Sequence, residues 1–170
     1  EASGRYSTEI GLSGEATQTF ATAVGEQAHA YGYASTALGR HAYATGSGST
    51  ALGYHAQSSG TNATAAGVDS IAAGGNSVAL GVQANAGGSG SAALGFAANA
   101  AGSFSTALGH YSHAAAIDDV AIGSSTYAAA TRSTAVGTLS RATGNGSSAF
   151  GGNANASGGH AIAIGYNSST

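Results

Sequence analysis

Hydrophobic and small residues recur with a period of 14 along the whole chain. The clearest marker is a glycine that returns twelve times without a gap and that follows a large apolar residue in eleven of the twelve copies. These anchor glycines are Gly11, Gly25, Gly39, Gly53, Gly67, Gly81, Gly95, Gly109, Gly123, Gly137, Gly151 and Gly165. An uninterrupted period of this kind predicts one small structural unit stacked on copies of itself.

The residues that lead into each anchor glycine alternate between small and large side chains. A typical copy reads Ser-Thr-Ala-Leu-Gly, as at 49–53. Alternation with a period of two is typical of a β-strand, because successive side chains point to opposite faces. One face carries Ser or Ala and then Ala, whereas the other carries Thr or Val and then the large aliphatic residue. We therefore predict one strand per unit, with its small face turned inward.

The second half of each unit also alternates. Small residues stand three and five positions after the anchor glycine, such as Ala28 and Ala30, and bulkier residues stand before and between them. A second glycine follows seven positions after the anchor in eight copies, and Ala116 and Ala130 replace it in two others. We expect this glycine to supply a positive φ for a tight reversal. Each unit is thus predicted to be strand, turn, strand, turn, and the chain to be an all-β, parallel two-strand β-roll.

The large aliphatic residues then lie outside the roll, where they form an apolar stripe. Burying each of them is worth roughly 1.5–3 kcal/mol, so the pattern favours association of identical rods around a shared axis. Geometry alone leaves a dimer and a trimer open. The candidate residues for the shared core are Val24, Leu38, Leu52, Leu80, Leu94, Leu108, Ile122, Val136, Phe150 and Ile164.

Composition narrows the possible partners. Only 6% of the residues are charged, the formal net charge is −3, and Cys is absent. These values predict no nucleic-acid partner, no direct membrane contact by this chain and no disulfide framework. With 42% hydrophobic residues in fixed phases of the repeat, the chain is predicted to be folded despite its 29 glycines.

Chemistry-bearing side chains are few. His41 and His55 share one phase of the repeat in adjacent units, so their rings are expected about 4.8 Å apart, yet we identified no Asp, Glu or Cys that completes a metal site. Asp118 and Asp119 fit a charged turn better than an ion site. No nucleophile has an activating base, and no phosphate-binding loop is present. We therefore predict no catalytic residue, no metal and no cofactor, and the chain is not expected to be an enzyme.

Variable residues suggest a binding surface. Aromatic and Arg side chains on a rigid face suit protein recognition, and we place them on the outward side of the second strand. The candidates for contact with a ligand are Arg40, His41, Tyr43, Tyr54, His55, Tyr111, His113, Tyr127 and Arg141.

The repeat resembles a known family. Residues 49–60 and 76–88 are similar to the 14-residue head repeat of trimeric autotransporter adhesins, the YadA-like surface proteins of Gram-negative bacteria, and the resemblance extends from about residue 7 to 167. It implies a left-handed parallel β-roll, a homotrimer, and adhesion to host cells or to extracellular matrix such as collagen, fibronectin or laminin, with a role in virulence. It also implies display at the bacterial cell surface, with a neck, a stalk and an outer-membrane anchor in segments outside this chain.

In this interpretation residues 1–170 form a single head domain of about twelve repeats. The first coil is expected to be an atypical cap, because Glu9 stands where alanine is expected and Gln18 where the second glycine is expected. Three alternatives stay open. One is an ice-binding solenoid with an ordered Thr column, and another is a purely structural spacer. The third is a β-helix acyltransferase, which a period of 14 disfavours because those enzymes have coils of 18.

Overall fold

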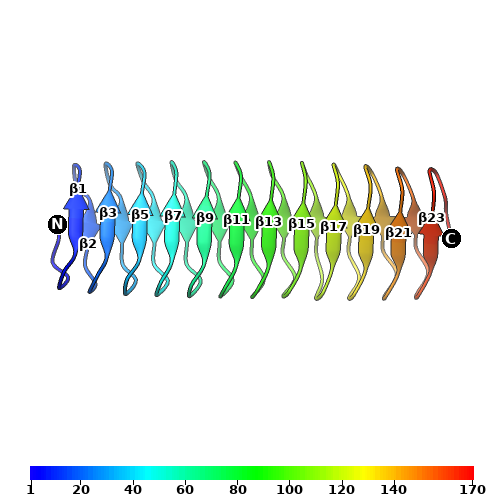
Figure 1. The fold of residues 1–170 in the computed structure, drawn as a ribbon, viewed down its shortest axis with the longest axis horizontal. Helices are drawn as coiled ribbons and strands as arrows, with labels where there is room; N and C mark the ends of the chain where they lie inside the picture. The colour runs from blue at the N-terminus through cyan, green and yellow to red at the C-terminus, as the bar shows by residue number, and fades with distance from the viewer.

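The computed structural model describes all 170 residues as a straight solenoid of two parallel β-sheets (Figure 1). Each coil contributes one strand to each sheet, and the coils follow one another in chain order from the N-terminus to the C-terminus. The predicted all-β, parallel β-roll is thus confirmed. The structure has no helix that is long and apolar enough to cross a membrane.

The first sheet contains twelve strands, each of which ends one residue before an anchor glycine. They are β1 (Thr8–Ile10), β3 (Thr22–Val24), β5 (Thr36–Leu38), β7 (Thr50–Leu52), β9 (Thr64–Ala66), β11 (Val78–Leu80), β13 (Ala92–Leu94), β15 (Thr106–Leu108), β17 (Val120–Ile122), β19 (Thr134–Val136), β21 (Ser148–Phe150) and β23 (Ile162–Ile164).

The second sheet contains eleven strands of two residues each. They are β2 (Glu15–Ala16), β4 (His29–Ala30), β6 (Tyr43–Ala44), β8 (Gln57–Ser58), β10 (Ile71–Ala72), β12 (Asn85–Ala86), β14 (Asn99–Ala100), β16 (His113–Ala114), β18 (Tyr127–Ala128), β20 (Arg141–Ala142) and β22 (Asn155–Ala156).

The register between coils is constant. In the first sheet Leu80 pairs with Leu94, and in the second sheet Asn85 pairs with Asn99, a separation of 14 residues that holds for every strand pair. Equivalent side chains therefore form continuous rows along the solenoid. One residue type at a given position of the repeat therefore determines the chemical character of a whole face.

Small residues fill the space between the sheets, as predicted. Ala93 of the first sheet and Ala100 of the second sheet are both completely buried, and the buried hydrophobic residues of the chain are all alanines. Serines such as Ser105 share the interior, where the Ser105 hydroxyl donates to the Gly102 carbonyl at 2.7 Å. A leucine in these rows would push the sheets apart, because close-packed interiors tolerate little added volume.

The anchor glycine is required by both its conformation and its neighbours. Gly81 has a φ of +131°, and a Cβ placed there would lie 2.6 Å from the Gly95 carbonyl oxygen in the next coil. An L side chain at this position would be strained by the backbone and would clash with the next coil. The same requirement returns every 14 residues, which explains why the row is unbroken.

Glycine is needed at the second turn for a different reason from the one that the sequence suggested. A Cβ at Gly74 would lie 1.9 Å from the Gly88 carbonyl oxygen, yet the positive φ of this turn belongs to Asn76, at +56°. The expectation of a positive φ at the second glycine is therefore wrong. Glycine is favoured at Gly74 because the backbone of the next coil approaches too closely there for a Cβ.

The two coils that carry alanine in this row have side-chain acceptors for the alanine N–H: a buried carboxylate at Ala116 and the Ser133 hydroxyl, at 3.4 Å, at Ala130. The Gly74 N–H donates to the Ala86 carbonyl of the next coil at 3.3 Å, whereas the Ala116 N–H donates to Asp119 Oδ2 at 2.7 Å. The other oxygen of Asp119 accepts from the Ser133 N–H at 2.9 Å and from the Ser133 hydroxyl at 3.0 Å. Asp119 is completely buried. The turn interpretation of the Asp118–Asp119 pair is thus the one that the geometry supports.

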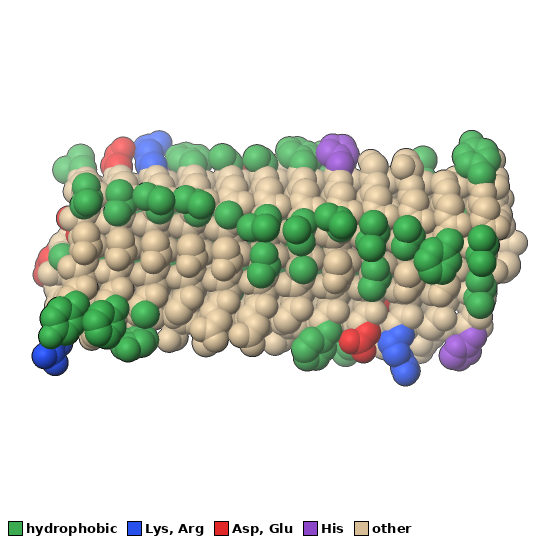
Figure 2. Space-filling model, in the orientation of Figure 1, with side chains coloured by type: hydrophobic (Ala, Val, Ile, Leu, Met, Phe, Trp, Pro, Cys, Tyr) green, Lys and Arg blue, Asp and Glu red, His purple; other side chains and the backbone are tan.

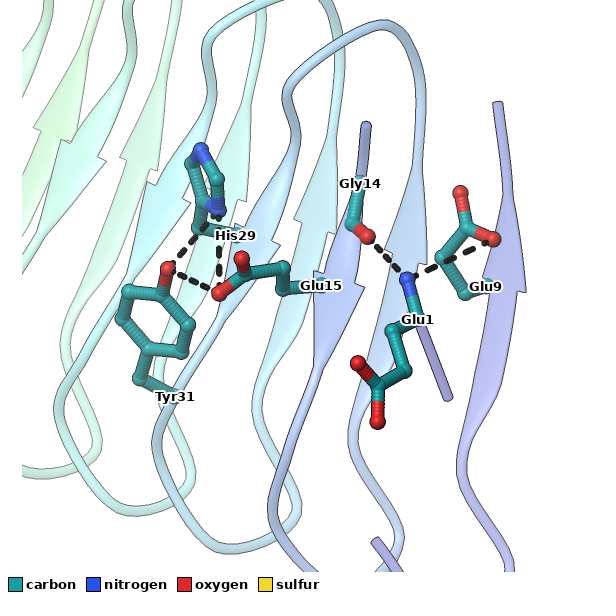
Figure 3. A network of polar contacts seen from close by, with 6 residues as sticks. All are labelled: Glu1, Glu9, Gly14, Glu15, His29 and Tyr31. Carbon is teal, nitrogen blue, oxygen red and sulfur yellow. Dashed lines mark hydrogen bonds and ion pairs between the residues drawn. The ribbon is translucent and has the colours of Figure 1, made fainter. Parts of the chain in front are cut away.

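The first coil departs from the repeat in a coordinated way. Glu9 occupies an inward alanine position, and Gly14 replaces the facing small residue, where a Cβ would lie 2.7 Å from Glu9 Oε1. The amino group of Glu1 lies 3.9 Å from the Glu9 carboxylate and donates to the Gly14 carbonyl (Figure 3). The capping role of this coil stays a prediction.

Candidate functional site

The outer face of the first sheet carries the apolar row that the sequence predicted. We call it the ridge, and define it by the residue before each anchor glycine, from Ile10 to Ile164. Figure 2 shows it as a nearly continuous green band along the solenoid. Leu52 and Leu108 are 44% and 43% exposed in the single chain, and Leu94 is half-buried. The ten candidate core residues therefore all lie in one row that points away from the interior.

A parallel row on the same face is more polar. Thr22, Thr36, Thr50 and Thr64 stand side by side in adjacent strands, and Val78 continues the row. These threonines are half-buried and flank the ridge. The row changes to Val and Ala at β11 and β13, so its regular Thr segment covers only the N-terminal coils.

The nine candidate ligand residues divide between two places. Tyr43, His113, Tyr127 and Arg141 are the first residues of β6, β16, β18 and β20, on the outer face of the second sheet. The other five lie in the first turn of their coils rather than on a strand, which corrects their expected position. They are Arg40, His41, Tyr54, His55 and Tyr111.

The correction has a local cause. His41, His55 and Tyr111 have φ values of 54°, 54° and 53°, in the left-handed region that interrupts a strand. The second strand therefore begins two residues later than the alternation suggested. These side chains project from the edge of the solenoid.

The turn residues of the N-terminal coils form a connected polar row. Arg40 Nε donates to Glu26 Oε2 at 3.1 Å, and its guanidinium carbon lies 5.7 Å from the centre of the Tyr54 ring. The rings of His41 and His55 are 5.1 Å apart and nearly perpendicular, with an interplanar angle of 71°. Each Arg or His in this row is thus held by the equivalent residue of a neighbouring coil.

The row also contains an acid that sequence reasoning missed. Asp69 occupies the phase of His41 and His55 one coil further on, and its Oδ1 lies 3.4 Å from His55 Nδ1. The period of 14 was the signal that would have found it. No group of three or more His, Cys, Asp or Glu side chains is arranged to hold a metal ion.

The second sheet presents a stack of three side chains in its C-terminal half. The rings of His113 and Tyr127 are 5.1 Å apart and almost parallel, at 5°, and the guanidinium carbon of Arg141 lies 5.1 Å from the centre of the Tyr127 ring. Arg141 has no ion pair with any acid of the chain. The stack restrains the guanidinium, while its hydrogen-bond donors stay free for a partner.

A second cluster on this sheet was not among the predicted residues. The Tyr31 hydroxyl donates to Glu15 Oε2 at 2.5 Å and lies 2.9 Å from His29 Nδ1 (Figure 3). The ring of His29 also stacks on Tyr43 at 4.9 Å. Loss of solvent around the phenol and its hydrogen bond to Glu15 raise the pKa of Tyr31 to about 12. Glu15, His29 and Tyr43 share one phase of the repeat, so the alignment of coils could have found this group.

Comparison with known proteins identifies the repeat. The family model described as "YadA head domain repeat (2 copies)" matches eight segments: 16–42, 31–56, 44–70, 58–84, 72–96, 86–112, 114–140 and 142–168. Among solved structures, the collagen-binding domain of the Yersinia adhesin YadA is similar at 24% identity and a TM-score of 0.48, over 92% of this chain and 69% of that chain. A search of curated proteins finds no match. The eight segments span most of the chain, which therefore belongs to the family of YadA head domain repeats.

Proposed function

We propose that this chain is the head of a bacterial surface adhesin, that it works as a homotrimer, and that it binds host cells or extracellular matrix. The observation that carries the proposal is the ridge, an apolar row along the whole of a solenoid built from YadA head repeats. In this proposal the chain binds rather than catalyses, and segments outside it attach it to the outer membrane.

The ridge supports self-association. Its side chains point away from an interior that is already filled with alanine, so nothing within the chain can cover them. Covering each one is worth roughly 1.5–3 kcal/mol, and the row repeats the same gain in nearly every coil. In the proposed homotrimer the first sheets of three chains face a shared axis, and the ten candidate core residues line that axis.

The second sheet then faces outward and is the proposed ligand surface. Tyr43, His113, Tyr127 and Arg141 project from it, and the last three form the restrained stack described above. Aromatic and Arg side chains that are fixed in place lose little conformational entropy on binding, which favours them as contacts. Because each ligand site is present once per chain, a trimer gains avidity on a repetitive matrix protein.

A binding assay with matched variants tests this proposal. The purified chain is examined by sedimentation equilibrium and then by solid-phase binding to collagen, fibronectin and laminin, the ligand class that the family implies. We expect a trimer that binds at least one of them, and at least a fivefold loss of affinity in a Tyr127→Ala, Arg141→Ala double variant. The matched control is Asn85→Ala, Asn99→Ala on the same face. A trimer that binds no matrix protein or host cell would contradict the adhesive function and favour the structural spacer.

A further inference from the structure

Three side chains that can bind a metal ion converge on the outer face of the second sheet, near its N-terminal end (Figure 3). Glu15 of β2 pairs with His29 of β4, so the carboxylate and the imidazole lie in adjacent coils. Tyr31 stands two residues after His29, and its side chain therefore lies on the same face. Carboxylate oxygen, imidazole nitrogen and phenol oxygen are all atoms that ligate transition metals in proteins.

The separations between these three atoms suit a single ion. The Tyr31 oxygen lies 2.5 Å from Glu15 Oε2 and 2.9 Å from His29 Nδ1, and the last two atoms are 3.8 Å apart. A circle through three atoms at these distances has a radius of about 1.9 Å, which is just below the length of zinc–nitrogen and zinc–oxygen bonds, about 2.0–2.2 Å. An ion slightly outside the plane of the three atoms can therefore reach all of them.

The surroundings hold the imidazole in place and leave the carboxylate accessible. The ring of His29 stacks on the Tyr43 ring at 4.9 Å, and its side chain is only 15% exposed. The Glu15 side chain is 46% exposed, and its one ionic neighbour is His29, so no Arg competes for the carboxylate. A ligand that packing already restrains loses less conformational entropy when an ion binds.

Other coils carry parts of this group and serve as internal comparisons. Six coils further on, His113 has the same phase and a similar stack on an aromatic ring. There Asn99 takes the carboxylate position and Ala115 takes the tyrosine position. In the first turns, His55 Nδ1 lies 3.4 Å from Asp69 Oδ1, but no phenol hydroxyl bonds to either side chain.

We propose that Glu15, His29 and Tyr31 bind a divalent transition-metal ion such as Zn²⁺ or Cu²⁺, the ions that suit a mixed set of nitrogen and oxygen ligands. Water fills the open position of the ion. When the phenol oxygen binds, the proton that it donates to Glu15 passes to solvent, and no electron is transferred. The sequence-based prediction of no metal does not hold in this proposal, because the ligands come from two coils and include a phenol.

The three ligands do not contribute equally. The pKa of Tyr31 is raised to about 12, so the phenol holds its proton firmly at neutral pH and is the weakest of the three. Glu15 and His29 therefore supply most of the affinity. The site faces away from the ridge, so the ion has access to it in a single chain and in the proposed homotrimer alike.

Calorimetric titration of Zn²⁺ at neutral pH into the full chain, without a polyhistidine tag, tests the proposal. We expect one ion per chain. Glu15→Gln keeps an oxygen acceptor for Tyr31 but removes the charge, and His29→Gln removes the imidazole. Each should weaken Zn²⁺ binding at least tenfold, and Tyr31→Phe should weaken it less, by about threefold. Circular dichroism confirms that every variant keeps the β-fold.

Two controls are matched to these variants. Asp69→Asn makes the same carboxylate-to-amide change beside His55, and it should alter the affinity by less than about twofold because that pair lacks a third ligand. Mg²⁺ should not bind, because it takes oxygen ligands in octahedral geometry. The ring resonances of His29 in an NMR spectrum of the unaltered chain give a readout that needs no variant. They should shift when Zn²⁺ is added, whereas those of His113 should stay in place.

The absence of saturable Zn²⁺ binding would overturn the proposal. Binding that survives both Glu15→Gln and His29→Gln would also overturn it, as would binding that Asp69→Asn removes, because the ion would then lie elsewhere on the chain. Equal binding of Mg²⁺ would contradict the part assigned to the imidazole. None of these outcomes depends on whether the chain forms a trimer or binds a matrix protein.

Discussion

The outer faces of the two sheets differ far more than their inner faces do. Both inner faces carry Ala and Ser that are completely buried, and both sheets pair their strands at a spacing of 14 residues. On the outside, the first sheet repeats a large aliphatic residue in nearly every coil. The second sheet shows Glu, His, Tyr, Gln, Ile, Asn and Arg at the equivalent position.

The comparison is consistent with the different roles that we propose for the two outer faces. The inner faces must fit one another, and only small side chains fit. A row with one chemical character along the whole length suits a partner with the same repeat, which is another copy of the chain. A row that changes from coil to coil offers a different set of contacts at each coil, as the proposed ligand surface would.

Carboxylates introduced on the ridge should have the largest effect on self-association. We expect a Leu80→Asp, Leu94→Asp double variant to remain monomeric, because each chain loses about 1.5–3 kcal/mol of burial per leucine and would have to bury two carboxylates. Asn85→Asp, Asn99→Asp places the same charges on the second sheet of the same coils and should leave the assembly intact. Sedimentation equilibrium measures both. Equal dissociation by the two double variants would show that the outer faces do not differ in this role.

A change inside the roll should act on the fold rather than on either outer face. We expect Asp119→Ala to lower the free energy of unfolding by about 1–3 kcal/mol, because it removes the acceptor of the Ala116 N–H and of the Ser133 hydroxyl, and one of the two acceptors of the Ser133 N–H. Thermal unfolding followed by circular dichroism measures the loss. The neighbouring Asp118 is exposed, so Asp118→Ala should change stability by less than about 0.5 kcal/mol. Equal effects of the two variants would refute the structural role of the buried carboxylate.

The smallest expected effect is on the stability of the fold at alkaline pH, and it arises from Tyr31 beside the second sheet. Because the pKa of Tyr31 is raised to about 12 from its ordinary 10.0, the unfolded chain ionises this phenol first. The stabilisation from Tyr31 is therefore fully present below pH 10 and is lost as the pH rises toward 12. Tyr31 is 36% exposed, so solvent screens the effect, and we expect only a small extra fall of the melting temperature between pH 9.5 and 11.5.

The matched variant for this prediction is Tyr31→Phe, which cannot ionise and should melt with a flatter alkaline dependence. Tyr127→Phe, on the outer face of the same sheet and seven coils away, serves as the control. An identical alkaline profile for Tyr31→Phe and the unaltered chain would contradict the prediction.

Much of this protein follows from its period. The register of 14, the inward rows of small residues and the outward ridge could all be predicted, because alternation assigns each side chain to a face and the repeat aligns the coils. The resemblance of 49–60 to an adhesin head repeat was confirmed by the family match. The sequence placed only some of the candidate ligand residues on the correct element. The alternation of small and bulky residues continues through the first turn, although the backbone there is no longer a strand.

The tertiary structure decided what happens between neighbouring coils. Left-handed φ values at His41 and His55 shorten the second strand to two residues and move these side chains to the edge. Close approach of the Gly88 carbonyl, rather than a positive φ, excludes a side chain at Gly74, and the carboxylate of Asp119 accepts the N–H of Ala116, one of the two alanines in this row. The pattern of residues determines which face each side chain occupies, because that depends only on the parity along a strand. Distances between turns depend on the path of the backbone in three dimensions, and parity carries no information about that path.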